Sequence, residues 1–156
     1  MRSVLHKTSL LLQRFEEQFI KWAMLLLCLI VGYQIVGRNL GLPAGWTGEV
    51  ALLVSTWMTY MGAALAVRTK THFTVDLFMG KKGPLISAMS VLATVLVLFF
   101  VSYLVWQGFL MAYLVRLRVS GIADISMGLY FISLPISAVF MIIHMVDAVL
   151  NPQEED

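Results

Sequence analysis

Four apolar runs separated by short polar segments set the pattern of the chain. They predict transmembrane spans at about 20–37, 49–68, 85–113 and 127–150. The second run has no charged residue from 50 to 67, which at about 1.5 Å per residue almost crosses a hydrocarbon core roughly 30 Å thick. Because an open strand in lipid would leave backbone groups unpaired, each run is expected to be a helix. The pattern therefore predicts an all-α membrane protein, a four-transmembrane-helix bundle.

The composition supports this interpretation. Hydrophobic residues make up 60% of the chain and charged residues 13%, and the mean hydropathy is +0.85. Too little polar surface remains to cover a soluble domain, so residues 1–156 are expected to form a single integral membrane domain. The single cysteine, Cys28, excludes an intrachain disulfide and a cluster of thiolate ligands.

Residues 3–19 precede the first span and have an amphipathic pattern. Apolar residues such as Leu11 and Phe15 recur at helical spacing, whereas Arg14 and Glu17 are charged. The pattern predicts an N-terminal helix that lies in the membrane interface. The alternative is a polar extension of the first span. A cleaved signal peptide is not expected, because the apolar core is short and no small-residue cleavage site follows it.

Lysine and arginine are unevenly distributed between the two sides of the predicted bundle. One side carries Arg2, Lys7, Arg14, Lys21, Arg68, Lys70, Lys81 and Lys82, and the other carries Arg38, Arg116 and Arg118. Because short cytoplasmic loops are enriched in basic residues, both termini are expected in the cytoplasm. The loop lysines Lys70, Lys81 and Lys82 are also candidates to contact lipid headgroups.

Few residues in the predicted spans suit catalysis. Of the three histidines only His144 lies inside a span, and the chain has no HExxH motif, phosphate loop or nucleophile elbow. We therefore expect no enzyme activity, bound metal or cofactor. Glu49 is the most suggestive ionisable residue, because acids within membranes are costly and often functional. Its place after Trp46 at the start of the second span leaves three roles open: ion transport, contact with Arg38 or a partner, and helix capping.

One face of the second span carries small residues. Gly48, Ser55, Thr59, Gly62 and Ala66 follow one another at spacings of seven, four, three and four. Such a face lets another helix approach closely, and close packing drives helix association in lipid. The partner helix is either in this bundle or in another subunit.

The fourth span carries a polar stripe of Tyr130, Ser133, Ser137, His144 and Asp147, with Pro135 expected to bend the helix. The two serines can return their hydroxyls to the helix backbone and so indicate little. His144 and Asp147 are three residues apart and can share one side of the helix. They predict a polar contact near the cytoplasmic end, inside the bundle or with another subunit.

Four short motifs lie between residues 38 and 78: RNLG, GWTGEV, GAALAVR and THFTVD. The first motif supplies Arg38, and the second supplies Trp46 and Glu49 before the second span. The third is a Gly/Ala-rich helix end that finishes with the basic residue Arg68, and the fourth is a His-x-x-Val-Asp turn. With these motifs the chain resembles the small membrane subunit of tripartite ATP-independent periplasmic (TRAP) transporters, the DctQ-like family. Size and the predicted four spans extend the resemblance over essentially the whole chain.

The resemblance implies a division of labour within a transporter of the bacterial inner membrane. A periplasmic binding protein would capture an organic anion, a large membrane subunit would carry the substrate and sodium sites, and this chain would be a non-catalytic scaffold. No nucleic acid is expected among its partners. By family likeness, the residues that stabilise the bundle or its contact with the large subunit are Arg38, Trp46, Glu49, Arg68, His72 and Asp76.

Two other functions remain open at this stage. A self-sufficient small ion-coupled transporter would use Glu49, and a haem or quinone subunit would use His144. The scarcity of acids and histidines at mid-membrane argues against both. The transported substrate is not indicated by the sequence.

Overall fold

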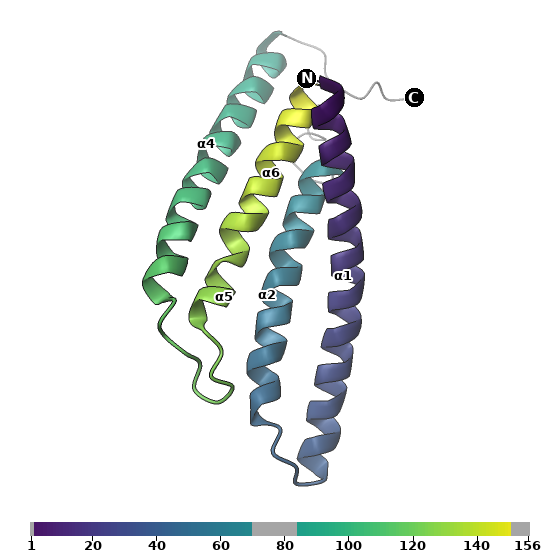
Figure 1. Ribbon diagram of the computed structural model, residues 1–156. Helices are drawn as coiled ribbons and strands as arrows, with labels where there is room; N and C mark the ends of the chain where they lie inside the picture. The colour runs from purple at the N-terminus through teal and green to yellow at the C-terminus, as the bar shows by residue number, and fades with distance from the viewer. Residues whose placement is uncertain (1, 70–83, 151–156) are drawn as a thin grey trace.

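The computed structural model of the protein describes residues 2–69 and 84–150. All named elements in these two ranges are helices: α1 (Arg2–Asn39), α2 (Gly45–Arg68), α4 (Pro84–Val115), α5 (Met127–Phe131) and α6 (Ser133–Leu150) (Figure 1). Four helical stretches are long and apolar enough to cross a membrane: His6–Asn39, Gly45–Arg68, Leu92–Val115 and Met127–Leu150. The predicted all-α membrane protein with four such helices is confirmed.

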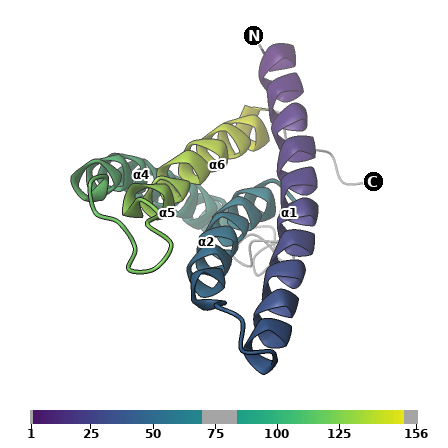
Figure 2. The ribbon, with the colours of Figure 1, turned by 60° about the horizontal axis from the view of Figure 1, so that its bottom comes forward.

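The helices stand in a row rather than in a closed bundle. Across the molecule α1 packs against α2, α2 against α6, and α6 against α4, and α6 also meets the first part of α1 (Figures 1 and 2). The start of α1 and the end of α6 lie at the same end of the molecule. Because the outer faces of these helices have no neighbouring helix among the described residues, many large apolar side chains are exposed, as at Trp22 and Phe99. The arrangement is more open than the compact bundle that the sequence predicts, and its apolar faces suit lipid or another membrane protein.

The first helix differs from its prediction. Residues 3–19 do not form a separate helix, because α1 continues without interruption from Arg2 to Asn39. Ser9 and Glu16 are fully buried in this segment. Since these buried polar groups find partners on α2 and α6, the segment packs along the other helices as a polar extension of the first span, which is the alternative given above.

The fourth span is interrupted where Pro135 was expected to bend it. Helix α5 ends at Phe131 and α6 begins at Ser133. Pro135 has no amide hydrogen for the carbonyl of residue 131, which weakens the helix at this turn. The ring of Pro135 lies against Gly108 of α4, where an added methyl group would come within 2.8 Å of the proline Cδ. Gly108 therefore permits the close approach of α4 and α6.

Candidate functional site

A first polar cluster surrounds Glu49 at the α1–α2 loop end of the row. Its carboxylate accepts hydrogen bonds from the Ser120 hydroxyl (2.6 Å) and from the Ala123 and Ile122 amides (2.7 and 3.1 Å). The tyrosine hydroxyl of Tyr130 donates to the Glu49 carbonyl at 2.9 Å. Glu49 therefore fastens the start of α2 to the loop between α4 and α5 and to the fourth span. This contact holds a loop inside the chain, whereas the partner contact that was the other role open to Glu49 by family likeness stays a prediction.

Two other candidate residues at this end of the molecule, Arg38 and Trp46, lie outside the Glu49 cluster. Arg38 is exposed and, in the part of the chain that the structure describes, forms no ion pair with Glu49. The expected contact between the two is therefore absent there. Trp46 lies against Tyr33 of α1, with ring centroids 6.0 Å apart and planes tilted by 40°. It joins the ends of α1 and α2 while remaining 43% exposed.

A second polar cluster lies at the opposite end and centres on Arg68. The guanidinium donates to the Asp147 carboxylate at 3.0 Å and to the Gln13 side-chain oxygen at 2.6 Å. It also donates to the Ser9 hydroxyl. The last residue of α2 is thus bound to both α1 and α6. A guanidinium can do this because it presents five donors in a fixed plane.

The cluster continues inward from Ser9. The Ser9 hydroxyl lies 2.8 Å from His144 Nδ1, and His144 Nε2 lies 3.2 Å from Glu16 Oε2. One order of donors satisfies all these contacts: Arg68 donates to Ser9, Ser9 to Nδ1, and Nε2–H to Glu16. His6 also approaches Asp147, with Nδ1 3.2 Å from Oδ2. These hydrogen bonds and ion pairs offset the desolvation cost of ionisable side chains that are buried away from water.

The prediction of a polar contact at His144 and Asp147 agrees with this cluster, since both residues are buried and bound inside the chain. Sequence reasoning missed Ser9, Gln13 and Glu16 on α1. Their spacing of four and three places them on one helix face, but the apolar residues between them indicated an interfacial helix instead. It also missed Ser120, whose loop carries no motif.

The middle of the small-residue face of α2, at Thr59 and Gly62, has no packing partner among the described residues, whereas Gly48 at its start approaches Gln34 of α1. The side chains that α2 buries belong to Thr47, Met61 and Ala64, on the opposite side of the helix. At Gly62 an added Cβ would have no neighbouring atom within 4 Å, and Thr59 is exposed. The hydroxyls of Ser55 and Thr59 bond to carbonyls of their own helix. The part of the face at Thr59 and Gly62 therefore has room for a helix other than those described.

Five candidates lie outside the described residues: Lys70, His72, Asp76, Lys81 and Lys82. Within the described ranges, no three His, Cys, Asp or Glu side chains are grouped closely enough to hold a metal ion. The chemistry of the described site is therefore that of hydrogen bonds and ion pairs between helices.

Comparison with known proteins shows to which family the chain belongs. The search of curated proteins found no match. A family model described as "Tripartite ATP-independent periplasmic transporters, DctQ component" matches residues 27–154. The matched range includes Glu49, Arg68, His144 and Asp147, and begins after Ser9 and Glu16. It covers most of the chain, and the chain therefore belongs to the DctQ family, the small membrane subunits of TRAP transporters.

Proposed function

We propose that this chain is a non-catalytic scaffold that holds the large membrane subunit of a TRAP-type secondary transporter. In the proposed complex, a periplasmic binding protein delivers an organic anion, and the large subunit carries out its sodium-coupled uptake. The complex lies in a bacterial inner membrane. Both termini of the small subunit are in the cytoplasm, in line with the distribution of lysine and arginine.

The open small-residue face of α2 is the observation that carries the proposal. Helices in lipid associate where small side chains let their backbones approach, and no described residue comes within 4 Å of a Cβ added at Gly62 on this face. Gly62 and Thr59 lie at its centre and have room for a partner. A transmembrane helix of the large subunit is the partner that family membership supplies.

The two polar clusters support a mechanical role. Glu49 fastens the periplasmic end and Arg68 the cytoplasmic end, so that neighbouring helices in the row are tied near their ends. A scaffold needs this stiffness, because a large subunit that moves during transport requires a fixed element to move against. Use of Glu49 as an ion carrier is not favoured, since its carboxylate is already held by a loop.

Two groups of residues outside the described ranges belong to the same proposal. His72 and Asp76 would form a turn that stabilises the subunit contact, and Lys70, Lys81 and Lys82 would meet phospholipid headgroups on the cytoplasmic side. Arg38, which is exposed in the last turn of α1, is proposed to contact the large subunit.

Co-purification tests the scaffold function. The chain is tagged at its C-terminus, expressed from its native locus and extracted in mild detergent, and co-eluting proteins are identified by mass spectrometry. We expect a large polytopic subunit in about equal amount. Recovery of the chain alone, as a homodimer that moves ions in liposomes, would contradict the proposal.

A pair of glycine variants then tests the face. Gly62→Leu places a bulky side chain on the small-residue face, and Gly32→Leu is the matched control on α1, where an added Cβ also has no neighbour within 4 Å. Gly62→Leu is expected to reduce recovery of the large subunit at least tenfold, whereas Gly32→Leu leaves recovery near that of the native chain.

A further inference from the structure

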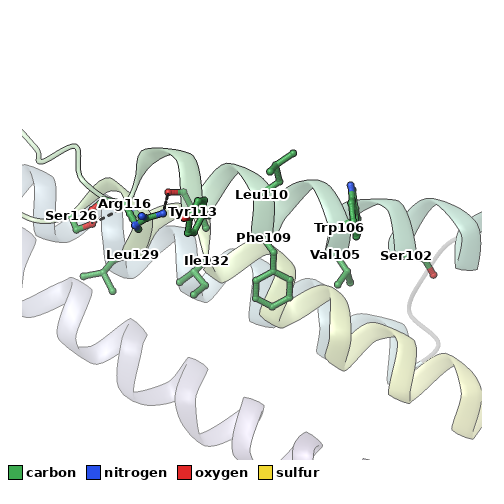
Figure 3. A pocket seen from close by; sticks show the side chains of 12 residues that line it. Ser102, Val105, Trp106, Phe109, Leu110, Tyr113, Arg116, Ser126, Leu129 and Ile132 are labelled. Carbon is green, nitrogen blue, oxygen red and sulfur yellow. Dashed lines mark hydrogen bonds between the residues drawn. The ribbon is translucent and has the colours of Figure 1, made fainter.

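A groove of about 1100 Å³ runs along α4 and the start of the fourth span, apart from both polar clusters. Its walls are mainly apolar and include Val105, Phe109, Leu129 and Ile132. Figure 3 shows Arg116, Tyr113 and Ser126 together at one end and Ser102 at the other. The groove is therefore a long apolar channel with one cation at its end.

The position of Arg116 is fixed by its surroundings. Its guanidinium carbon lies 3.6 Å from the centre of the Tyr113 ring, and Nη1 donates to the Tyr113 carbonyl at 3.1 Å. The Ser126 hydroxyl donates to the Arg116 carbonyl at 2.7 Å. Gly128 allows this approach, since an added Cβ there would lie 3.1 Å from the Arg116 Cα. The arginine backbone is therefore held between α4 and α5.

The charge of Arg116 is not neutralised within the described part of the chain. No carboxylate in residues 6–69 or 92–150 forms an ion pair with it, and its contacts to Tyr113 occupy one of its five donors. The side chain is exposed. An anion with oxygen acceptors can therefore reach the remaining donors, and arginine suits phosphate because two parallel hydrogen bonds can form.

We propose that the groove binds a phospholipid, with one acyl chain along the apolar wall and the phosphate on Arg116. The lining residues on α4 extend from Ser102 to Tyr113, about 16 Å at about 1.5 Å per residue. One leaflet contributes roughly half of a 30 Å hydrocarbon core, so an acyl chain fits along this length. Arg116 follows the last residue of α4, where a span meets the headgroup layer. The inference is independent of the scaffold function.

The combination of features selects this ligand over two others. A small free anion would satisfy Arg116 and leave the apolar channel empty. An apolar helix of a partner protein would fill the channel and leave the arginine without an anion. A phospholipid has both an acyl chain for the apolar channel and a phosphate for Arg116, and the two are joined in the same order as these parts of the groove.

A photoactivatable lipid tests the proposal in membranes that contain the chain together with its large subunit. The probe is phosphatidylglycerol with a diazirine on one acyl chain, and labelled peptides are mapped by mass spectrometry. We expect labelling in the peptides that contain Val105, Phe109 and Ile132. Arg116→Gln should reduce this labelling about tenfold, because charge-assisted hydrogen bonds to the phosphate are lost.

Three further comparisons define the result. Arg118→Gln removes a nearby exposed charge that does not line the groove, and it should leave labelling within about twofold of the native level. Diacylglycerol carrying the same diazirine chain lacks the phosphate and should label no better than the Arg116→Gln variant does with phosphatidylglycerol. Val105→Trp, which fills the channel, should reduce labelling by both probes.

The proposal is overturned by any of three outcomes. Equal labelling of the native chain and Arg116→Gln would show that the phosphate is not bound there. An equal loss in Arg118→Gln would indicate attraction by general charge. A native groove that takes no label from phosphatidylglycerol would show that a phospholipid does not occupy the channel.

Discussion

The Arg68 guanidinium lies 3.0 Å from the Asp147 carboxylate and joins the end of α2 to the end of α6. The side chains are only 12% and 5% exposed, so the pair is largely shielded from solvent. Each partner supports the other, because an isolated charge at such a place has a large desolvation cost. The pair is the centre of the cluster that also holds α1.

Removing one member of this pair is expected to destabilise the chain strongly. Arg68→Met removes the guanidinium that lies against the buried Asp147 carboxylate and should lower the free energy of unfolding by about 3–5 kcal/mol. The double variant Arg68→Met/Asp147→Leu should recover part of this loss, because no charge is then left unpaired. Unfolding in mixed detergent, followed by circular dichroism, measures both. Equal instability of the double and single variants would contradict the assignment.

The His144–Glu16 contact leads to a related prediction. Glu16 Oε1 has no hydrogen-bond partner among the described residues, so His144 is the contact that satisfies the carboxylate. His144→Leu should therefore destabilise the chain by roughly 3 kcal/mol, and His144→Leu/Glu16→Leu should be the more stable of the two variants. The same unfolding assay compares them. A double variant less stable than His144→Leu would contradict this account.

Close packing at Gly108 predicts sensitivity to a single methyl group. Gly108→Ala brings a Cβ within 2.8 Å of the Pro135 ring and should cost about 1–3 kcal/mol of stability, since neither helix can move freely. Gly32→Ala is the matched control, because its Cβ would meet no atom within 4 Å. The control should be neutral or slightly stabilising. Similar unfolding curves for both variants would show that α4 and α6 are not tightly packed there.

The loop held by Glu49 should become mobile when the carboxylate is removed. In Glu49→Ala the amides of Ile122 and Ala123 lose their acceptor and should exchange hydrogen faster, while the helices keep their protection. Hydrogen–deuterium exchange with peptides covering 117–126 measures this. Arg38→Gln, at the same end of the molecule, is the control and should leave the exchange unchanged. Unaltered exchange in Glu49→Ala would remove the proposed link between α2 and the loop.

The number and type of the main helices could be predicted from the sequence. Lipid allows few structures for long apolar runs, so length and the absence of charge decide the assignment. The row-like order of the helices was not predictable in this way. It depends on pairs that are far apart in the chain, such as Ser9 with His144.

The polar site was predicted only in part. His144 and Asp147 were singled out by their spacing in the fourth span, and Arg68 by the resemblance to the DctQ-like family. Their α1 partners were assigned to an interfacial helix, since Ser9 and Gln13 resemble ordinary polar positions. The partners of Glu49 could not be found from the sequence, because the amides of Ile122 and Ala123 are backbone groups with no residue preference.

Site-specific photo-cross-linking at Thr59 tests the central claim most directly. A benzophenone side chain at this position lies on the small-residue face of α2, next to Gly62 and exposed in the isolated chain. Irradiation of intact membranes should give an adduct with the large membrane subunit, and the adduct should be absent in Gly62→Leu. A complex that co-purifies intact while Thr59 cross-links only to lipid would show that the scaffold contacts its partner through another face.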